Sequence, residues 1–412
     1  MGDVATKLAT IFFYQRFSSK PGRRRRLFLP YNYSKLDAAP LTRDDLDVLR
    51  SQPDEHALHY GGNVFEGIRA IPKAVGYHGE KLVAASPLEL ALLNAEAHAG
   101  RFLHSMEALR LREPKYVRAV PHIEGLKRYD DSKDLFVPED FDKKYLLDII
   151  TELIQRNAAA GHIHPEEGKL YVRPLAFRAS RGDGLLGVYS LTHDIVFQAM
   201  VQEWGDYLPV KGSTLVVYDK EIGGSLRHVK AGANYADGQI AKNDAMRYVT
   251  DRGTFSFDDA LYTDGRGYVL EATGANIFFM KDKGIITPSR EQPILPGITR
   301  EVAMELAKNM GYHLADGDIP LGEIEEYDCA FLTGTATGLC PVGVIYNPKD
   351  EKVVKFNQRY EPFLELQEEF MRLRDGREVQ PQNQGLQQRV RGFRIEIKPS
   401  VVKPYSRDSK SV

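Results

Sequence analysis

The chain has 412 residues, enough for two domains that each bury a core. Its 55 lysine and arginine residues nearly balance 57 aspartate and glutamate residues, which argues against an overall basic field that would attract nucleic acid. It holds two cysteines, Cys329 and Cys340, and no apolar run near the ~18 residues of a membrane-spanning helix, so we expect a protein of the reducing cytoplasm without a membrane partner.

The first part of the chain, residues 1–56, is predicted to be an N-terminal extension with strands over 10–14 and 27–29. Its start fits a myristoylation pattern, and the arginine run at 23–26 could add an electrostatic membrane signal. We favour a solvated extension over this membrane anchor, and predict no function for either feature.

A block of glycines and aromatic residues follows at 57–69. The glycines let the backbone turn and present Tyr60 and Phe65 to a pocket, although ordinary core packing explains Phe65 as well.

Ser86-Pro87-Leu88-Glu89 has the pattern of a capping box with proline at the first helical position. It predicts that a helix begins here, with a broad apolar face that runs from Leu92 to Met106. Arg101 lies on this predicted helix, where an exposed helical arginine is the ordinary alternative to a functional one.

The next elements are a helix predicted over 141–160, a strand over 169–173, a flexible loop over 181–186 and a second strand over 195–201. The first strand ends in Arg173. A charged residue at the end of an apolar strand is costly to desolvate unless it is paired, so Arg173 marks either a site or a structural ion pair. Residues 202–212 then have the composition of a linker, in which Trp204 and Tyr207 could cover an apolar substrate side chain.

Three features of the second half of the chain carry the chemistry. Lys230 precedes a small-residue turn, and Tyr235 follows five positions later, before a helix predicted over 237–249. Glu271 ends the second strand of a hairpin whose turn contains Asp264-Gly265. Pro296-Gly297 then opens a predicted helix over 299–310.

An amine, a carboxylate and a helix-opening turn are the groups that a pyridoxal phosphate site requires. The lysine forms a Schiff base, the acid keeps the ring nitrogen protonated, and the unpaired amides at a helix N-terminus bind the phosphate. Each feature alone has an ordinary explanation: a surface lysine, a strand end and a connection. Their combination predicts a site for pyridoxal 5′-phosphate.

The last features are a turn, a helix and a tail. The small-residue turn at 333–338 exposes consecutive amides, which suits an anion. A closing helix is predicted over 360–373, and an alternating edge strand over 393–398 lies within a polar extension at 377–412.

In their order along the chain, these blocks resemble those of the fold-type IV pyridoxal phosphate enzymes, and most closely the branched-chain amino-acid aminotransferases. The resemblance rests on the blocks at 57–69, 171–175, 204–207, 227–235, 270–279, 295–300 and 331–337.

The resemblance implies an α+β fold related to D-amino-acid aminotransferase, with two domains that each combine a mixed sheet or barrel with helices. A smaller N-terminal domain would span 57–201, the interdomain loop 202–212, and a larger cofactor-binding domain 213–376. In the family, a loop equivalent to 181–186 lines the active site of the neighbouring subunit, which implies a homodimer or a larger assembly of this chain.

The resemblance also implies roles for single residues. Lys230 would be the catalytic Schiff-base lysine and general base. The other cofactor-binding residues would be Arg101, Tyr235, Glu271, Gly297, Ile298, Thr299 and Thr335. The substrate-binding residues would be Tyr60, Phe65, Arg173, Leu185, Trp204, Tyr207, Thr335 and Ala336.

The implied reaction is transamination between branched-chain L-amino acids and 2-oxoglutarate, with amino acids and 2-oxo acids as the small-molecule partners. Arg173 could bind the side-chain carboxylate of glutamate. The same scaffold hosts D-amino-acid and amine transaminases and aminodeoxychorismate lyase, and a pyridoxal phosphate-binding protein without turnover is a further alternative.

Overall fold

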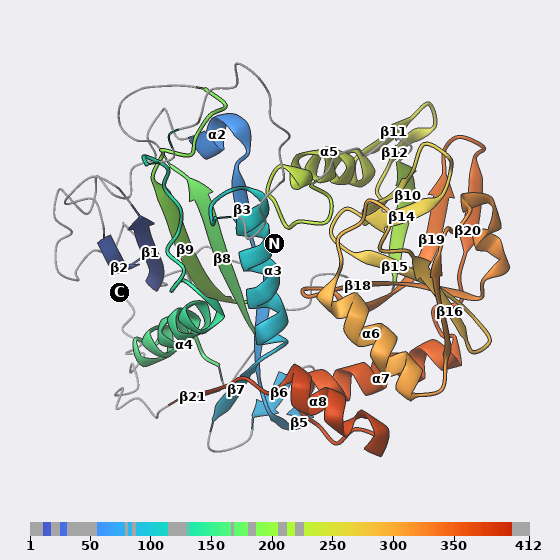
Figure 1. The fold of residues 1–412 in the computed structure, drawn as a ribbon. Coiled ribbons are helices and arrows are strands. Elements are labelled where there is room, and N and C mark those ends of the chain that lie inside the picture. The colour runs from blue at the N-terminus through green and yellow to red at the C-terminus, as the bar shows by residue number, and fades with distance from the viewer. Residues whose placement is uncertain are drawn as a thin grey trace, which may run out of the picture.

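The computed structural model describes residues 11–17, 25–30, 56–78, 81–84, 88–113, 130, 132–165, 169–179, 187–204, 212–218 and 226–397. Its strands form two large sheets, which stand side by side in Figure 1 and are called here the N-terminal and C-terminal sheets. Helices pack on both, so the expected α+β architecture is confirmed.

The N-terminal sheet is antiparallel throughout. Its strands in spatial order are β2 (Arg25–Pro30), β1 (Ile11–Phe17), β9 (Ile195–Glu203), β8 (Leu170–Arg178), β4 (Ile68–Pro72), β7 (Glu89–Leu92) and β21 (Arg394–Glu396), and β3 (Asn63–Phe65) pairs with β8. A separate hairpin joins β5 (Ala74–His78) to β6 (Lys81–Ala84), and the short helix α2 (His56–Tyr60) precedes β3.

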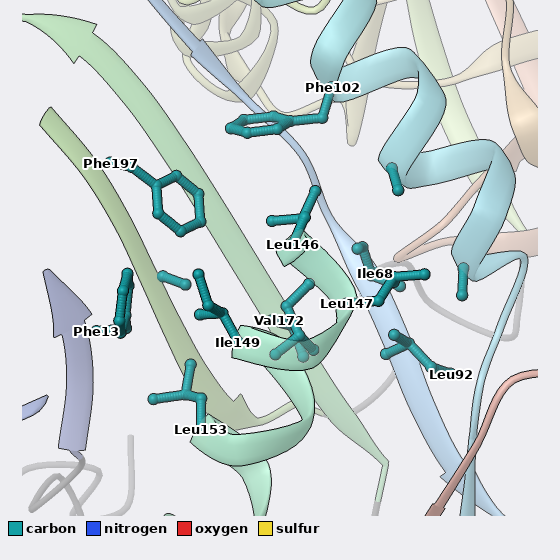
Figure 2. Packing of buried hydrophobic residues seen from close by; sticks show 14 of the residues in the cluster. Phe13, Ile68, Leu92, Phe102, Leu146, Leu147, Ile149, Leu153, Val172 and Phe197 are labelled. Atoms are coloured by element: carbon teal, nitrogen blue, oxygen red, sulfur yellow. The ribbon is translucent and has the colours of Figure 1, made fainter. Parts of the chain in front are cut away.

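Two helices, α3 (Ala95–Ala108) and α4 (Lys143–Ala159), bury their apolar faces against this sheet. Figure 2 shows the result, in which Phe102 from α3 and Leu146 from α4 meet Phe197 from β9. The α4 helix begins where Asp142 accepts a hydrogen bond from the Tyr145 amide at 2.8 Å, and the chain leaves it through Gly161 at positive φ, as predicted.

The C-terminal sheet closes on itself. Its strands in order are β14 (Val269–Ala272), β13 (Asp259–Thr263), β10 (Ser213–Tyr218), β19 (Gly338–Asn347), β18 (Cys329–Gly334), β15 (Asn276–Lys281), β16 (Gly284–Pro288) and β17 (His313–Gly317), and β20 (Lys352–Lys355) pairs with β19. Because β14 also pairs with β15, the strands from β14 to β15 form a ring around a buried cluster.

Helices and short elements cover the C-terminal sheet. The helices are α5 (Asn234–Met246), α6 (Ile298–Asn309), α7 (Glu361–Asp375) and α8 (Gln384–Val390). The short elements are the hairpin of β11 (Tyr248–Thr250) and β12 (Gly253–Phe255), and the 3₁₀ turns η2 (Leu321–Glu326) and η3 (Pro381–Asn383). A shared hydrophobic cluster joins the two sheets, because Ile71 and Leu93 pack with Leu306 and Leu366.

Two predictions of secondary structure need correction. The capping box at 86–89 does not begin a helix, because Glu89–Leu92 is strand β7 and α3 begins only at Ala95. Two neighbouring strands, β4 and β21, take up the hydrogen bonds of β7, and this pairing outweighs the local helical signal. The helix expected over 237–249 begins at Asn234 and ends at Met246, where the β11 strand takes over.

The remaining expectations about organisation have different outcomes. Strand β21 lies at the edge of the N-terminal sheet, although its residues were assigned to a separate C-terminal extension. The domain limits themselves stay a prediction. Within the described part of the chain, no helix is both long and apolar enough to cross a membrane.

Candidate functional site

A cavity of about 260 Å³ lies where the two sheets meet, and residues from both sheets line it. Most of the predicted site residues are in its wall: Phe65, Arg101, Arg173, Trp204, Lys230, Tyr235, Glu271, Gly297, Ile298, Thr299, Thr335 and Ala336. Its volume is close to the lower end, roughly 300 Å³, of small-molecule pockets.

Lys230 reaches into this cavity between two aromatic rings. Its Nζ donates a hydrogen bond to the Tyr235 hydroxyl at 2.6 Å, and it lies 4.9 Å from the centre of the Phe65 ring. Phe65 and Tyr235 pack against each other with ring centroids 4.8 Å apart. The amine is therefore held at a fixed place, with a polar partner on one side and apolar surface on the other.

The backbone around Lys230 is tied to strand β3 of the other sheet. The Phe65 amide donates to the Lys230 carbonyl at 3.1 Å, and the Gly232 amide donates to the Asn63 carbonyl at 2.9 Å. The side chain of Asn63 lies so close to Gly232 that a Cβ at this position would overlap with its Oδ1. A side chain at 232 would therefore displace Asn63, next to the bonds that fix the Lys230 loop.

Glu271 is the carboxylate of the cavity. It is 9% exposed, and its oxygens accept hydrogen bonds from the Leu295 amide at 3.1 Å and from Asn276 Nδ2 at 3.0 Å. Burial raises the pKa of Glu271 from 4.5 to about 8, although the Leu295 amide and the charges of Arg227 and Lys230 act in the opposite direction. This acid can therefore keep or share a proton near neutral pH.

The N-terminus of α6 points its unpaired amides at the same cavity. Gly297 is the N-cap residue in an extended conformation, so the amides of Ile298 and Thr299 precede the first hydrogen bond of the helix. Asn276 Nδ2 also donates to the Leu295 carbonyl at 3.0 Å, and a Cβ at Gly297 would overlap with Asn276 Oδ1. Asn276 thus joins Glu271 to the turn that opens α6.

Arg101 sits beside this turn in a buried ion cluster. Its Nη2 and Nε donate to the two oxygens of Glu66 at 2.7 and 2.9 Å, and its Nη1 donates to the Pro296 carbonyl at 3.1 Å. His98 Nδ1 lies 3.2 Å from Glu66 Oε2. Burial alone would raise the pKa of Glu66, but the charges of Arg101 and His98 hold that pKa well below its usual range. The Arg101 guanidinium is therefore held in place by a Glu66 carboxylate that stays ionised.

Arg173 extends from the middle of β8 into the cavity. It donates to the Tyr171 hydroxyl at 2.9 Å and lies 4.6 Å from the centre of the Phe65 ring. Its Nε is buried without a hydrogen-bond partner among the described residues. A guanidinium in this position can bind a carboxylate through its N–H groups while its plane packs on aromatic rings.

Arg69 holds the turn at 335–337 from behind. It is 4% exposed, and it donates to the carbonyls of Ala336 at 3.1 Å, Thr335 at 3.4 Å and Trp204 at 2.5 Å. In a trans peptide the carbonyl and the following N–H point in opposite directions. Because these carbonyls face Arg69, the amides of Ala336 and Thr337 face the cavity that both residues line.

The structure does not bring every predicted residue into the cavity. Tyr60 ends α2 with 41% of its surface exposed and is not part of the described wall. Tyr207, Leu185 and the loop at 181–186 lie outside the described residues.

Several residues of the site lie within the sequence blocks described above, but the sequence assigned no role to them. They are Glu66, Arg69, Tyr171, Arg227 and Asn276. A signal existed for two of them, since Glu66 and Arg69 are charged residues within an otherwise mostly apolar stretch at 64–71, and the structure buries positions 66–72. Such charges need partners, and these partners lie far away in the sequence.

Comparison with known proteins extends over both sheets. A family model described as amino-transferase class IV matches residues 64–345. A probable branched-chain-amino-acid aminotransferase of Staphylococcus aureus (strain MRSA252) is 28% identical over 338 residues, which cover 79% of this chain and 80% of the relative. Branched-chain-amino-acid aminotransferase 1, mitochondrial, of Arabidopsis thaliana is 29% identical over 301 residues, 71% of this chain and 65% of the relative.

Solved structures resemble the fold over a larger part of the chain. A T.th. branched-chain amino acid aminotransferase complexed with N-(5′-phosphopyridoxyl)-L-glutamate has a TM-score of 0.61 and 25% identity, and it covers 92% of this chain and 97% of its own. The branched-chain amino acid aminotransferase of Escherichia coli resembles it in fold, with a TM-score of 0.61 at 20% identity, over 90% of this chain and 96% of its own. All residues that line the cavity lie within the matched residues 64–345.

Proposed function

The chain belongs to the amino-transferase class IV family, and on this premise we propose that it transfers the amino group of branched-chain L-amino acids to 2-oxoglutarate. It is an aminotransferase of fold type IV, and its cofactor is pyridoxal 5′-phosphate. The observation that carries the proposal is the position of Lys230, whose amine lies in one cavity with Glu271, the N-terminus of α6 and Arg173.

The residues present fit the cofactor. The cavity holds an amine for the aldehyde, a buried acid for the ring nitrogen, and unpaired helix amides for the phosphate. Bound pyridoxal phosphate supplies an aldehyde that takes the amino group and a protonated ring that accepts the charge left on the substrate carbon.

Lys230 has two tasks in this proposal. Its amine would be the group that holds the cofactor aldehyde, and the same Nζ would serve as the general base that takes and returns the proton of the substrate Cα. The Tyr235 hydroxyl, 2.6 Å from Nζ, keeps the amine pointed at the reacting atoms. The Phe65 ring under Nζ limits the water that can reach it.

Glu271 holds the ring proton. A carboxyl whose pKa is about 8 can share a proton with a pyridine nitrogen rather than surrender it to water. Asn276 and the Leu295 amide hold its oxygens in place, and they connect this acid to the turn that would bind the phosphate. The ring and the phosphate would therefore be positioned by one hydrogen-bonded unit.

The phosphate would bind the amides of Ile298 and Thr299, with Arg101 beside them. Arg101 carries the Glu66 carboxylate on its Nε edge, so its Nη1, which faces the Pro296 carbonyl, is the nitrogen nearest the turn. This arrangement supports a positioning contact to the phosphate rather than a large net positive charge, because Glu66 already balances the guanidinium.

The substrate side combines one cation with aromatic surface. Phe65, Tyr171 and Trp204 suit an apolar side chain, and Arg173 among them suits the second carboxylate of glutamate or 2-oxoglutarate. The amides of Ala336 and Thr337, turned toward the cavity by Arg69, suit the α-carboxylate that all of these substrates share. The pocket can thus accept an apolar and an acidic side chain in turn.

The direct test reduces the cofactor-loaded protein with borohydride and maps the modified peptide. We expect the label at Lys230 and no label in Lys230→Ala, whereas Lys308→Ala, a change on the exposed face of α6, should label like wild type. A panel of donors with 2-oxoglutarate should then favour leucine, isoleucine and valine. Activity on D-alanine or aminodeoxychorismate alone, or no amino transfer from any donor, would contradict the proposed reaction.

We also infer a homodimer in the cytoplasm. Leu58, Tyr60, Val188 and Tyr189 expose 71%, 41%, 80% and 54% of their surfaces, and this apolar surface would be buried if a second copy of the chain covered it. Both cysteines are buried and free, which suits a reducing compartment. Sedimentation at micromolar concentration tests the assembly: a monomer of 46.4 kDa would contradict it.

A further inference from the structure

The chain crosses between the two sheets a second time after α7, in a segment outside the residues that the family model matches. Gly376 at positive φ ends α7, and η3, α8 and β21 follow. The α8 helix lies with α6 and α7 on the C-terminal side, whereas β21 is the edge strand of the N-terminal sheet (Figure 1). We call residues 376–397 the C-terminal clasp.

One end of the clasp is anchored on α7 by a buried carboxylate. Glu369 is 2% exposed, and its Oε1 accepts hydrogen bonds from the Gln380 amide at 2.7 Å and from Asn383 Nδ2 at 2.9 Å. Gln387 adds donations to the carbonyls of Arg377 at 2.8 Å and Arg372 at 3.2 Å. The start of the clasp is thus fixed to the C-terminal half by hydrogen bonds, and breaking them would leave buried polar groups unsatisfied, which is energetically unfavourable.

The other end completes the N-terminal sheet. Arg394, Ile395 and Glu396 pair with β7, and Ile395 is 1% exposed in the core shared with α3 and α4. The Leu92 amide donates to the Phe393 carbonyl at 2.9 Å, and the Ile397 amide donates to the Leu88 carbonyl at 3.1 Å. Without this strand, β7 would be left with one unpaired edge.

Arg391 joins the two ends. It is 7% exposed, its Nη2 donates to the Ile71 carbonyl at 3.3 Å, and its Nη1 donates to the carbonyl of Arg374 at the end of α7. Next to it, the Val390 carbonyl accepts a hydrogen bond from the Asn94 amide at 2.8 Å. One guanidinium therefore bridges strand β4 and helix α7, which belong to different halves of the molecule.

These contacts lie next to two elements that carry residues of the site. Ile71 lies two residues after Arg69 on β4, and Asn94 immediately precedes α3, which carries Arg101. Val390 also lines a second, smaller cavity of about 40 Å³ directly behind the turn at 335–336. The clasp therefore contacts the strand that carries Arg69, the start of the helix that carries Arg101, and the small cavity behind the turn at 335–336.

We propose that the C-terminal clasp positions the substrate-binding half of the site on the cofactor-binding half, and that Arg391 is its central positioning residue. The proposal rests on the function given above, because that function assigns substrate contacts to Tyr171 and Arg173 on the N-terminal sheet and to the turn at 335–337, which Arg69 of the same sheet holds. Lys230, Glu271 and α6, in contrast, lie on the C-terminal side. A loosened clasp should therefore weaken substrate binding while the cofactor stays attached.

The test compares Arg391→Gln with Arg389→Gln in the full-length, cofactor-loaded protein. Arg389 is the matched control, since it lies two residues earlier, in the last turn of α8, but is exposed and pairs with Glu305 at the surface. For Arg391→Gln we expect KM for leucine and for 2-oxoglutarate to rise about tenfold, which corresponds to about 1.4 kcal/mol, while kcat and the cofactor absorbance change little. Hydrogen exchange should become faster in β4 and β7. Arg389→Gln should match wild type in every measurement.

Two results would overturn the clasp. One is an Arg391→Gln protein with wild-type KM and wild-type exchange in β4 and β7. The other is a parallel loss of kcat and bound cofactor without a change in KM, which would mean a general structural role. Should Arg391→Gln fail to fold, Ile395→Ala, which removes the apolar contact of β21 with the core of the N-terminal sheet, is judged by the same two criteria.

The exchange measurement also separates this proposal from the proposed function. If the wild-type protein transfers no amino group but Arg391→Gln still accelerates exchange in β4 and β7, the reaction is wrong and the clasp stands. If wild-type activity is present and exchange is unchanged in Arg391→Gln, the clasp is wrong and the reaction stands.

Discussion

Replacing Arg69 with methionine should weaken the reaction with amino acids by a factor that the geometry sets. Methionine fills a similar space but donates no hydrogen bond, so the carbonyls of Thr335 and Ala336 lose the group that turns them away from the cavity. The amides on the opposite side of the same peptides would then lose their fixed orientation toward the α-carboxylate.

The size of the effect follows from the two contacts on the turn. A hydrogen bond from a charged donor contributes about 1.5–3 kcal/mol. The contact to Ala336 at 3.1 Å counts in full, whereas the contact to Thr335 at 3.4 Å is at the limit of such bonds and adds little. A loss of about 2 kcal/mol corresponds to about a 30-fold decrease in kcat/KM.

The assay compares leucine with 3-methylbutylamine, which is leucine without its carboxylate. Amino transfer to the cofactor is followed by absorbance in single-turnover experiments. Arg69→Met should lose about 30-fold with leucine and nearly nothing with the amine. Arg69→Lys keeps the charge without the planar fork and should fall between. Arg266→Met, at an exposed hairpin position, is the control for arginine loss. An equal loss with both substrates would refute the reasoning, because Arg69 would then support the fold and not the turn.

Three further changes test the cofactor side of the site. Glu66→Gln leaves Arg101 buried without its carboxylate and should lower the free energy of unfolding by about 3 kcal/mol in urea titrations. Glu96→Gln, at an exposed ion pair, should change this free energy little. Equal effects of the two substitutions would contradict the role of the buried pair. Glu271 has a folded-state pKa of about 8 against an ordinary 4.5, so between these pH values the folded chain keeps a proton that the unfolded chain releases. The stability of the apo-protein should therefore fall as the pH rises from 4.5 to about 8 in wild type, and this fall should be absent in Glu271→Gln. Gly297→Ala forces a methyl group against Asn276 Oδ1 and should weaken cofactor binding in equilibrium titrations, whereas Gly322→Ala, where a Cβ meets no atom within 4 Å, should not.

Much of the site could be predicted because its chemistry is local. Lys230, Glu271 and the turn at 296–299 each stand in a short pattern whose secondary structure follows from its own residues. A hairpin with an Asp-Gly turn puts Glu271 at a strand end, and Pro296-Gly297 before an apolar periodicity opens a helix. The structure places all three in the wall of one cavity.

The failed helix prediction shows where local reasoning stops. Ser86 to Glu89 has the residues of a capping box, and Leu90 and Leu92 would suit a helix or a strand equally. Their state is decided by β4 on one side and by β21, about 300 residues later in the chain, on the other. The few residues that decide a local helix signal contain neither partner, and β21 lies far beyond any such window, so tertiary pairing overrode the local signal.

The same limit explains why Arg69 received no role. Its sequence neighbours are apolar, and they indicate only that the residue is buried. What it does depends on carbonyls at 204, 335 and 336, which become its partners only after the two sheets have met. Burying a guanidinium without partners would be strongly unfavourable, so the partners had to exist, but the sequence does not say which they are.

The groups of the site therefore divide by how the fold brings them together. Lys230, Glu271 and the α6 N-terminus follow one another within the C-terminal half, and β3 of the other sheet adds two backbone hydrogen bonds to the Lys230 loop. Tyr171 and Arg173 reach the same cavity, and Arg69 reaches the turn in its wall, only through contacts between the halves. These contacts are the β3 bonds to the Lys230 loop, the Arg69 bonds to the turn, and the clasp around Arg391. Substrate affinity should consequently be more sensitive than cofactor attachment to changes at the seam, even at residues that touch neither ligand.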